Sequence, residues 1–149
     1  MSKRQPIVVM LGEFETELMT GLNKEGIKVR FFNDFESYDD IDGDILLVDK
    51  NFEKQAMSIL KMKTMVPVVY VENKFFVEFE PNREVGFAFV YKDDHYLSQF
   101  AAVIRAYETF KFPFDWKGLM AEVKAVSDVC CTSSNAVAVV KALPNKKII

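Results

Sequence analysis

The sequence contains few of the residues from which metal centres and nucleophilic active sites are built. It has 149 residues with one histidine and two cysteines, and the cysteines, Cys130 and Cys131, are adjacent in the chain. A disulfide between neighbouring residues is strained, and two cysteines without further Cys or His nearby do not make a zinc site. We interpret them as small buried or half-buried thiols, with a redox role as the alternative.

Long apolar runs and an excess of basic charge are also absent. The first apolar run, Ile7 to Leu11, is too short for a signal peptide or a membrane span. The formal net charge of -3 argues against general affinity for nucleic acid or acidic membranes. No glycine-rich phosphate loop follows the first run, and no Ser or Cys nucleophile has a His partner. We therefore expect a cytoplasmic protein without a cofactor, without enzymatic activity and without a membrane or nucleic-acid partner.

What the sequence does contain is a series of apolar segments typical of buried strands. In the central one, Asp44-Ile45-Leu46-Leu47-Val48-Asp49, four apolar residues are closed by a carboxylate, which indicates a strand buried on both faces of a parallel sheet. Further strands are predicted at Ile7 to Leu11, Ile27 to Phe32, Val68 to Val71 and Phe87 to Tyr91. Amphipathic segments lie between several of these, and the alternation predicts a doubly wound, five-stranded parallel sheet.

The C-terminal part of the chain has two further stripes of apolar residues at helical spacing. Asp115 is a plausible cap for the first helix, and Thr132 to Asn135 mark the start of a second, which Pro144 would end. Both stripes need a surface to cover. We therefore predict a domain over residues 1–112 and a C-terminal helical hairpin extension over 113–149, docked on the sheet or on another chain.

Three ionisable residues each follow a predicted strand directly: Asp49, Glu72 and Lys92. A parallel sheet collects the residues that follow its strands along one edge, where ligands of open α/β sheets bind. The simplest interpretation is a charge-balanced cluster in which Lys92 neutralises one or both acids. A phosphate-accepting aspartate, and a metal or small-ligand site, are the alternatives.

This pattern resembles the response-regulator receiver family over residues 7–110. The segment that ends at Asp49 is similar to the strand that carries the phospho-accepting aspartate in that family, and Pro67 to Val71 is similar to its fourth strand. Gly86 to Lys92 is similar to the family's fifth-strand motif, with Lys92 at the phosphate-contacting lysine and Phe89 at the switch aromatic. The resemblance implies a flavodoxin-like (CheY-like) topology.

Two positions depart from the receiver pattern. Receivers have two adjacent acids after their first strand to hold Mg²⁺, whereas this chain has Glu13 alone, so Glu13 and Asp49 are the only candidate metal ligands there. Glu72 stands where the family has Ser or Thr, and its carboxylate would repel a phosphoryl group. The resemblance is therefore to the atypical or pseudo-receivers, with no metal and at most a doubtful Mg²⁺ site.

The function expected from this resemblance is a signalling or scaffolding module that acts by protein–protein interaction, independently of phosphorylation. The alternatives are a phosphorylatable response regulator and a transcription regulator whose C-terminal helices are the output. The aromatic residues Phe75, Phe76 and Phe79 lie where receivers contact partners, and they are either core or an exposed interaction patch. In the second case we expect a protein partner, a homodimer, or both.

Overall fold

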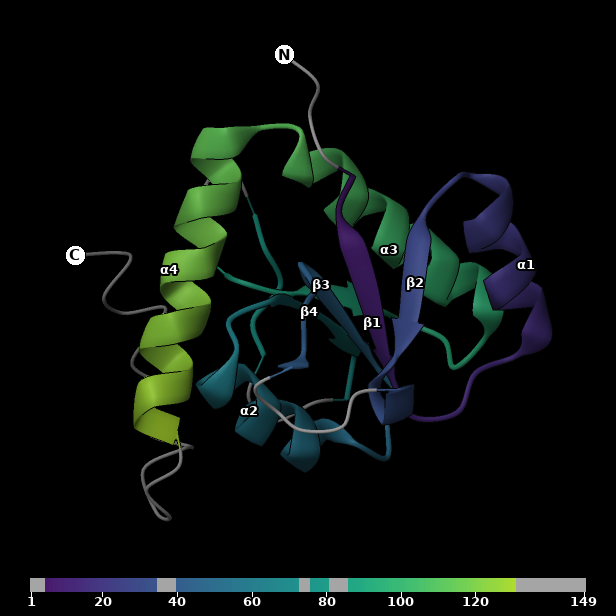
Figure 1. The fold of residues 1–149 in the computed structure, drawn as a ribbon. Coiled ribbons are helices and arrows are strands. Elements are labelled where there is room, and N and C mark those ends of the chain that lie inside the picture. Colours follow the sequence, from purple (N-terminus) through teal and green to yellow (C-terminus); the bar gives the residue numbers. More distant parts are fainter. Residues whose placement is uncertain (1–4, 35–39, 73–75, 81–85, 131–149) are drawn as a thin grey trace.

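The computed structural model describes residues 5–34, 40–72, 76–80 and 86–130. Its centre is a sheet of five parallel strands in the order β2-β1-β3-β4-β5 (Figure 1). The strands are β1 Ile7–Leu11, β2 Lys28–Phe31, β3 Ile45–Val48, β4 Val66–Tyr70 and β5 Phe89–Tyr91. The five predicted strands and the α/β class are thus confirmed, with β4 beginning two residues earlier and β5 two residues later than expected.

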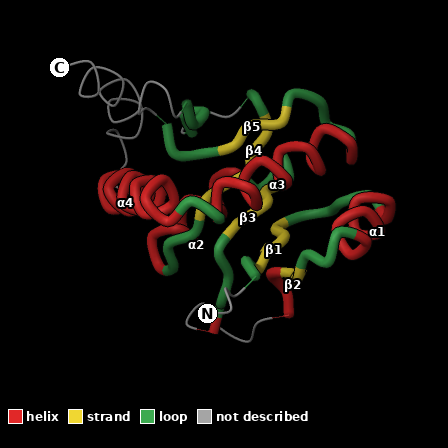
Figure 2. Tube along the Cα trace, turned by 90° about the horizontal axis from the view of Figure 1, so that it is seen from above, coloured by secondary structure: helices red, strands yellow, loops and turns green. Residues whose placement is uncertain are grey.

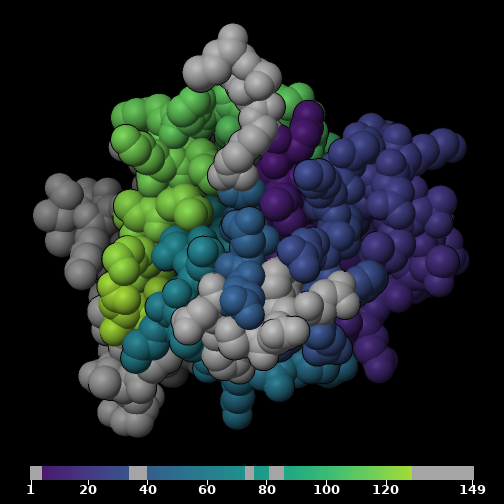
Figure 3. Space-filling view, in the orientation of Figure 1, coloured from purple at the N-terminus to yellow at the C-terminus, as the bar shows by residue number. Residues whose placement is uncertain are grey.

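Helices cover both faces of the sheet. They are α1 Thr16–Lys24, α2 Glu53–Met62, α3 Tyr96–Phe110 and α4 Pro113–Cys130, and a short 3₁₀ helix, η1, spans Phe32–Asp34. Seen from above, α1 and α3 lie on one side of the strands and α2 and α4 on the other (Figure 2). The space-filling view places α4 beside α2 along one flank of the molecule (Figure 3). None of the helices in the described part of the chain is long and apolar enough to cross a membrane.

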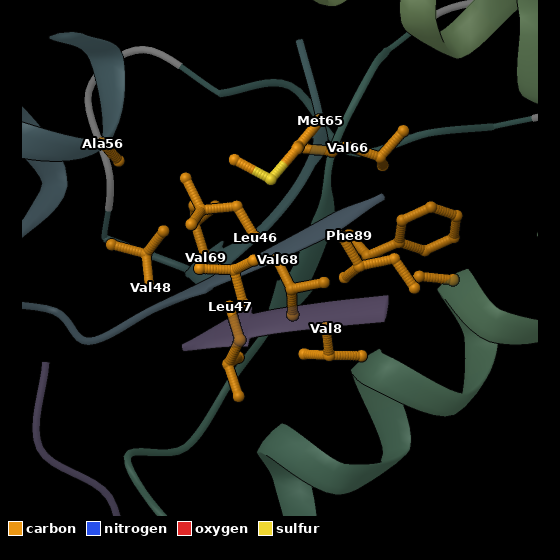
Figure 4. Close-up of a cluster of buried hydrophobic side chains, with 14 of the residues drawn as sticks. Val8, Leu46, Leu47, Val48, Ala56, Met65, Val66, Val68, Val69 and Phe89 are labelled. Atoms are coloured by element: carbon orange, nitrogen blue, oxygen red, sulfur yellow. The ribbon is translucent and has the colours of Figure 1, made fainter. Parts of the chain in front are cut away.

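The core is built on β3, whose side chains are all buried. Ile45, Leu46 and Leu47 are 0% exposed, and β3 lies between β1 and β4. Successive side chains of a strand point to opposite faces, so Leu46 and Leu47 pack in the core on opposite sides of the sheet (Figure 4). This is why the strand is a continuous apolar run and shows no alternation of apolar and polar residues.

Helix α4 joins the core through one face. Trp116, Leu119, Val123 and Val126 are buried, and the Trp116 ring meets the Phe110 ring edge-on at 5.1 Å between centroids. The helix begins at Pro113, two residues before the predicted cap Asp115, because proline has the φ of a helix and needs no N–H partner in the first turn. The predicted second helix of the hairpin lies outside the described residues.

The aromatic stretch after β4 returns to pair with the segment that leads into β5. Glu78 forms a parallel bridge with Ala88, and the Phe87 and Ala88 N–H groups both donate to the Val77 carbonyl. Gly86 has φ +88°, and a Cβ there would overlap the carbonyl oxygen of Glu78. Glycine is therefore the residue that allows the two segments to approach.

We predict that Gly86→Ala lowers the free energy of unfolding by about 1–3 kcal/mol, because the side chain adds left-handed strain and meets a backbone oxygen. The matched control is Gly118→Ala in α4, where a Cβ meets nothing within 4 Å. That change should raise the stability by about 0.5–1 kcal/mol, because alanine loses less backbone entropy in a helix. Urea denaturation followed by circular dichroism measures both, and equal effects would contradict the close approach of Gly86 to the Glu78 carbonyl.

Candidate functional site

The carboxylate of Asp49 lies at the carboxyl edge of the sheet, held by backbone groups of two loops. Its Oδ2 accepts a hydrogen bond from the Glu13 N–H and its Oδ1 from the Asn51 N–H, both at 3.2 Å. The residue is 8% exposed. Gly12, with φ +118°, allows the loop after β1 to pass close by, because a Cβ there would overlap the Cβ of Asp49.

A cavity of about 170 Å³ opens beside Asp49 at the ends of β3 and β4. Its lining comprises Val48, Asp49, Lys50, Asn51, Glu53, Val69, Tyr70 and Glu72. Two of the three predicted site residues, Asp49 and Glu72, are thus brought together. Glu72 is exposed on its rim, whereas Asp49 is buried.

Lys92 is not part of this cavity. Its side chain is exposed, and the residue lines a separate groove with Glu78 and Arg105. The lysine at the Asp49 cavity is instead Lys50, whose Nζ lies 3.0 Å from Oδ2 of Asp94. The hydrogen bond and the charge of Asp94 raise the pKa of Lys50. The feature of the sequence that could have identified Lys50 is its position next to Asp49, just after the central strand.

Glu13, the other candidate metal ligand, contributes its backbone to Asp49 and is exposed. The residue lines a second cavity, of about 260 Å³, together with Phe31, Phe32 and Phe52. Among the described residues, no three Asp, Glu, His or Cys side chains are grouped so that they could hold a metal ion. His95, in turn, caps α3, because its Nδ1 accepts the Leu97 N–H at 3.2 Å.

Tyr91 supports the floor of the site, a role that the sequence pattern did not indicate. Its hydroxyl is buried and donates to the Val48 carbonyl at 2.7 Å, and its ring packs on Tyr70 with centroids 5.6 Å apart. Burial raises the pKa of the Tyr91 hydroxyl, a hydrogen bond with Gln99 partly opposes this, and the charge of Asp49 adds to the increase. The fold thus keeps this phenol neutral.

The predicted switch aromatic and interaction patch lie largely in the core. Phe89 is 4% exposed and its ring packs on Phe79 at 5.8 Å. Phe76 is 7% exposed and packs on Phe87 at 5.9 Å. Phe79 is half-buried, and Phe75 lies outside the described residues. Phe79 therefore offers a partner more accessible surface than Phe76 does.

Comparison with known proteins directs attention to the C-terminal part of the chain. A family model described as quinolinate synthetase A protein matches residues 118–149. A quinolinate synthase of Pelobacter propionicus is 72% identical over 29 residues, which cover 20% of this chain and 10% of that enzyme. Quinolinate synthases of Geotalea uraniireducens and Geobacter metallireducens are each 66% identical over 29 residues, with the same coverage. No solved structure matches the chain.

The chain spans about a tenth of the length of the curated relatives it matches. The match begins inside α4, so residues 118–130 are the last part of a helix whose buried residues include Leu119, Val123 and Val126. Residues 131–149 lie outside the described residues. Both cysteines, Cys130 and Cys131, fall in the matched segment.

These matches overturn several predictions made from the sequence. Assignment to the receiver or pseudo-receiver family was wrong, because the family found is that of quinolinate synthetase A. The signalling or scaffolding function, with its response-regulator and transcription-regulator alternatives, is contradicted by the same matches. So is the prediction of no enzymatic activity, because the relatives are synthases. The error arose because apolar strands followed by an acid or a lysine are common to α/β sheets generally.

We predict that Asp49→Ala lowers the free energy of unfolding by about 1–3 kcal/mol, because the Glu13 and Asn51 N–H groups lose their acceptor. Glu72→Ala, in the same cavity but exposed, should change it by less than about 0.5 kcal/mol. Urea denaturation measures the difference. If the two variants are equally stable, water replaces the carboxylate and Asp49 is not needed for the fold.

We also predict that Tyr91 makes the protein less stable in alkali. The pKa of Tyr91 in the folded protein is raised above the ordinary value of 10.0. Its neutral hydroxyl therefore contributes fully to the free energy of unfolding below that pH. This contribution is lost as pH rises further, since the unfolded chain ionises this tyrosine first. In Tyr91→Phe the stability should fall less steeply above pH 10.0 than in the parent chain. Denaturant midpoints measured across that range test this, and parallel curves would contradict it.

Proposed function

We propose that this chain takes part in the synthesis of quinolinate and that residues 118–149 are the part of it that does so. The observation that carries the proposal is the match of residues 118–149 to the quinolinate synthetase A family. A curated synthase that is 72% identical to the chain over 29 residues supports it. Identity of this extent over so short a stretch points to retained side-chain chemistry more than to a shared helical pattern, which many sequences satisfy.

The α/β unit has a supporting part in this proposal. Helix α4 runs without a break across the start of the matched segment, with Trp116 buried before it and Leu119 and Val123 buried within it. The helix therefore fixes the start of the segment to the sheet domain. Burying these three side chains removes enough apolar surface to contribute several kcal/mol, at about 1.5–3 kcal/mol for a side chain of this size.

We further propose that the α/β unit has the flavodoxin-like arrangement. The strand order β2-β1-β3-β4-β5, all parallel, supports this finer assignment. In such sheets the ligand-binding edge is at the carboxyl ends of the strands, which is where Asp49 and its cavity lie. The domain boundary at residue 112, the cytoplasmic location and a homodimer or protein partner stay predictions.

The proposal predicts that the full chain restores growth, in medium without quinolinate, of a bacterium that lacks its own quinolinate synthase. Replacing Cys130 and Cys131 together by serine should abolish the rescue, because they are the only thiols in the chain and both lie in the matched segment. The matched control is Lys124→Gln, an exposed residue of the same segment, which should rescue normally.

Quinolinate measured by chromatography in the same cells, with expression verified by immunoblot, separates activity from protein level. Growth that depends on added quinolinate, in cells that contain the intact chain, would overturn the proposal. Full rescue by the double serine variant would instead show that the thiols are not what the segment contributes.

A further inference from the structure

β5 is the last strand of the sheet, and part of its backbone is directed away from β4. The Tyr91 carbonyl accepts from the Val71 N–H at 2.9 Å, so the bonds of this residue are directed inward. Because bonding direction alternates along extended backbone, the groups of Val90 in β5 and of Ala88, just before β5, are directed outward. Outward N–H and C=O groups on an edge strand are a template for pairing with another chain.

At Ala88 the outer edge is closed by main chain. The Ala88 N–H donates to the Val77 carbonyl at 3.1 Å, and the Phe79 N–H donates to the Ala88 carbonyl at 2.8 Å. Glu78, between them in sequence, lies opposite Ala88 as its parallel partner. A continuing strand would supply the next two bonds at Val90.

At Val90 these two bonds come from side chains. The Val90 N–H donates to Oε2 of Glu78 at 2.6 Å, and Nη2 of Arg105 donates to the Val90 carbonyl at 2.8 Å. The other two atoms of the pair, Nη1 of Arg105 and Oε1 of Glu78, are 2.6 Å apart. One carboxylate and one guanidinium thus supply the acceptor and the donor that a neighbouring strand would supply to Val90.

Both members of the pair are held in place by their surroundings. Glu78 lies between the two residues whose backbone bonds fix it against Ala88. The Arg105 guanidinium, from α3, lies 5.8 Å from the centre of the Phe89 ring. An ordinary surface ion pair loses side-chain entropy when it forms, whereas here much of that freedom is already restricted. Two residues after Val90, the Ser98 hydroxyl accepts the Lys92 N–H at 3.1 Å.

We propose that the Glu78–Arg105 pair closes the outer edge of β5 and so prevents two copies of the chain from associating through it. A second copy is the partner that an open edge would take, because two identical edges that meet antiparallel are complementary to each other. The pair therefore occupies the backbone groups of Val90 that could otherwise form hydrogen bonds to another chain. This inference does not depend on the proposed role in quinolinate synthesis.

The test is sedimentation velocity of the full chain over a range of concentrations, with Glu78→Ala and Arg105→Met as two separate variants. Each variant should associate at least about tenfold more tightly than the parent chain, which corresponds to about 1.4 kcal/mol. Hydrogen exchange read by NMR should show faster exchange at the Val90 amide in Glu78→Ala, because that N–H has lost its acceptor.

The matched control is Glu108→Ala, which removes the exposed ion pair between Glu108 of α3 and Lys111 just after the helix, with Nζ and Oε2 3.2 Å apart. This variant should sediment like the parent chain. If Glu78→Ala and Arg105→Met also sediment like the parent chain, the proposal is wrong. It is equally wrong if both variants unfold without associating, because the pair would then contribute only to stability.

Discussion

Burial of β3 on both faces is the constraint on which the rest of this structure depends. Because the strand has no face for water, both layers of helices and both neighbouring strands have to be in place around it. The two aspartates that flank it are part of the same arrangement. Asp44 accepts the N–H of Ile7, the first residue of β1, at 2.9 Å, and Asp49 accepts the Glu13 N–H at 3.2 Å just after β1. The acids therefore fix β1 against β3 at both ends.

Helix α4 links the two parts of the chain that the comparisons distinguish. Its first residues precede the segment that matches quinolinate synthetase A, and its remaining residues belong to that segment. The buried stripe continues through both, so the start of the segment is packed as part of the α/β core. A substitution at Leu119 or Val123 would thus affect the fold and the matched segment together, and exposed positions such as Lys124 separate the two effects.

The two edges of the sheet are protected in different ways. β2 is mostly exposed and carries Lys28 and Arg30, and charged side chains on an edge strand disfavour pairing with another chain. β5 is short, and the outward groups of Ala88, just before it, and of Val90, within it, are bonded by main chain and by the Glu78–Arg105 pair respectively. The aromatic stretch that the sequence left open as core or patch is what brings Glu78 there.

The five parallel strands and the apolar face of α4 could be predicted from the amino-acid sequence, because the length and period of apolar runs follow directly from burial. The sequence also placed Asp49 and Glu72 at one edge, since residues that follow parallel strands meet there. Which lysine joins these two acids could not be predicted, because it depends on the three-dimensional fold. Tyr91 buries its side chain beneath the site, and the next residue, Lys92, is exposed in a separate groove, whereas Lys50 pairs with Asp94 beside the cavity. Such pairings depend on how loops leave the sheet, and a loop's path is set by contacts between residues far apart in sequence.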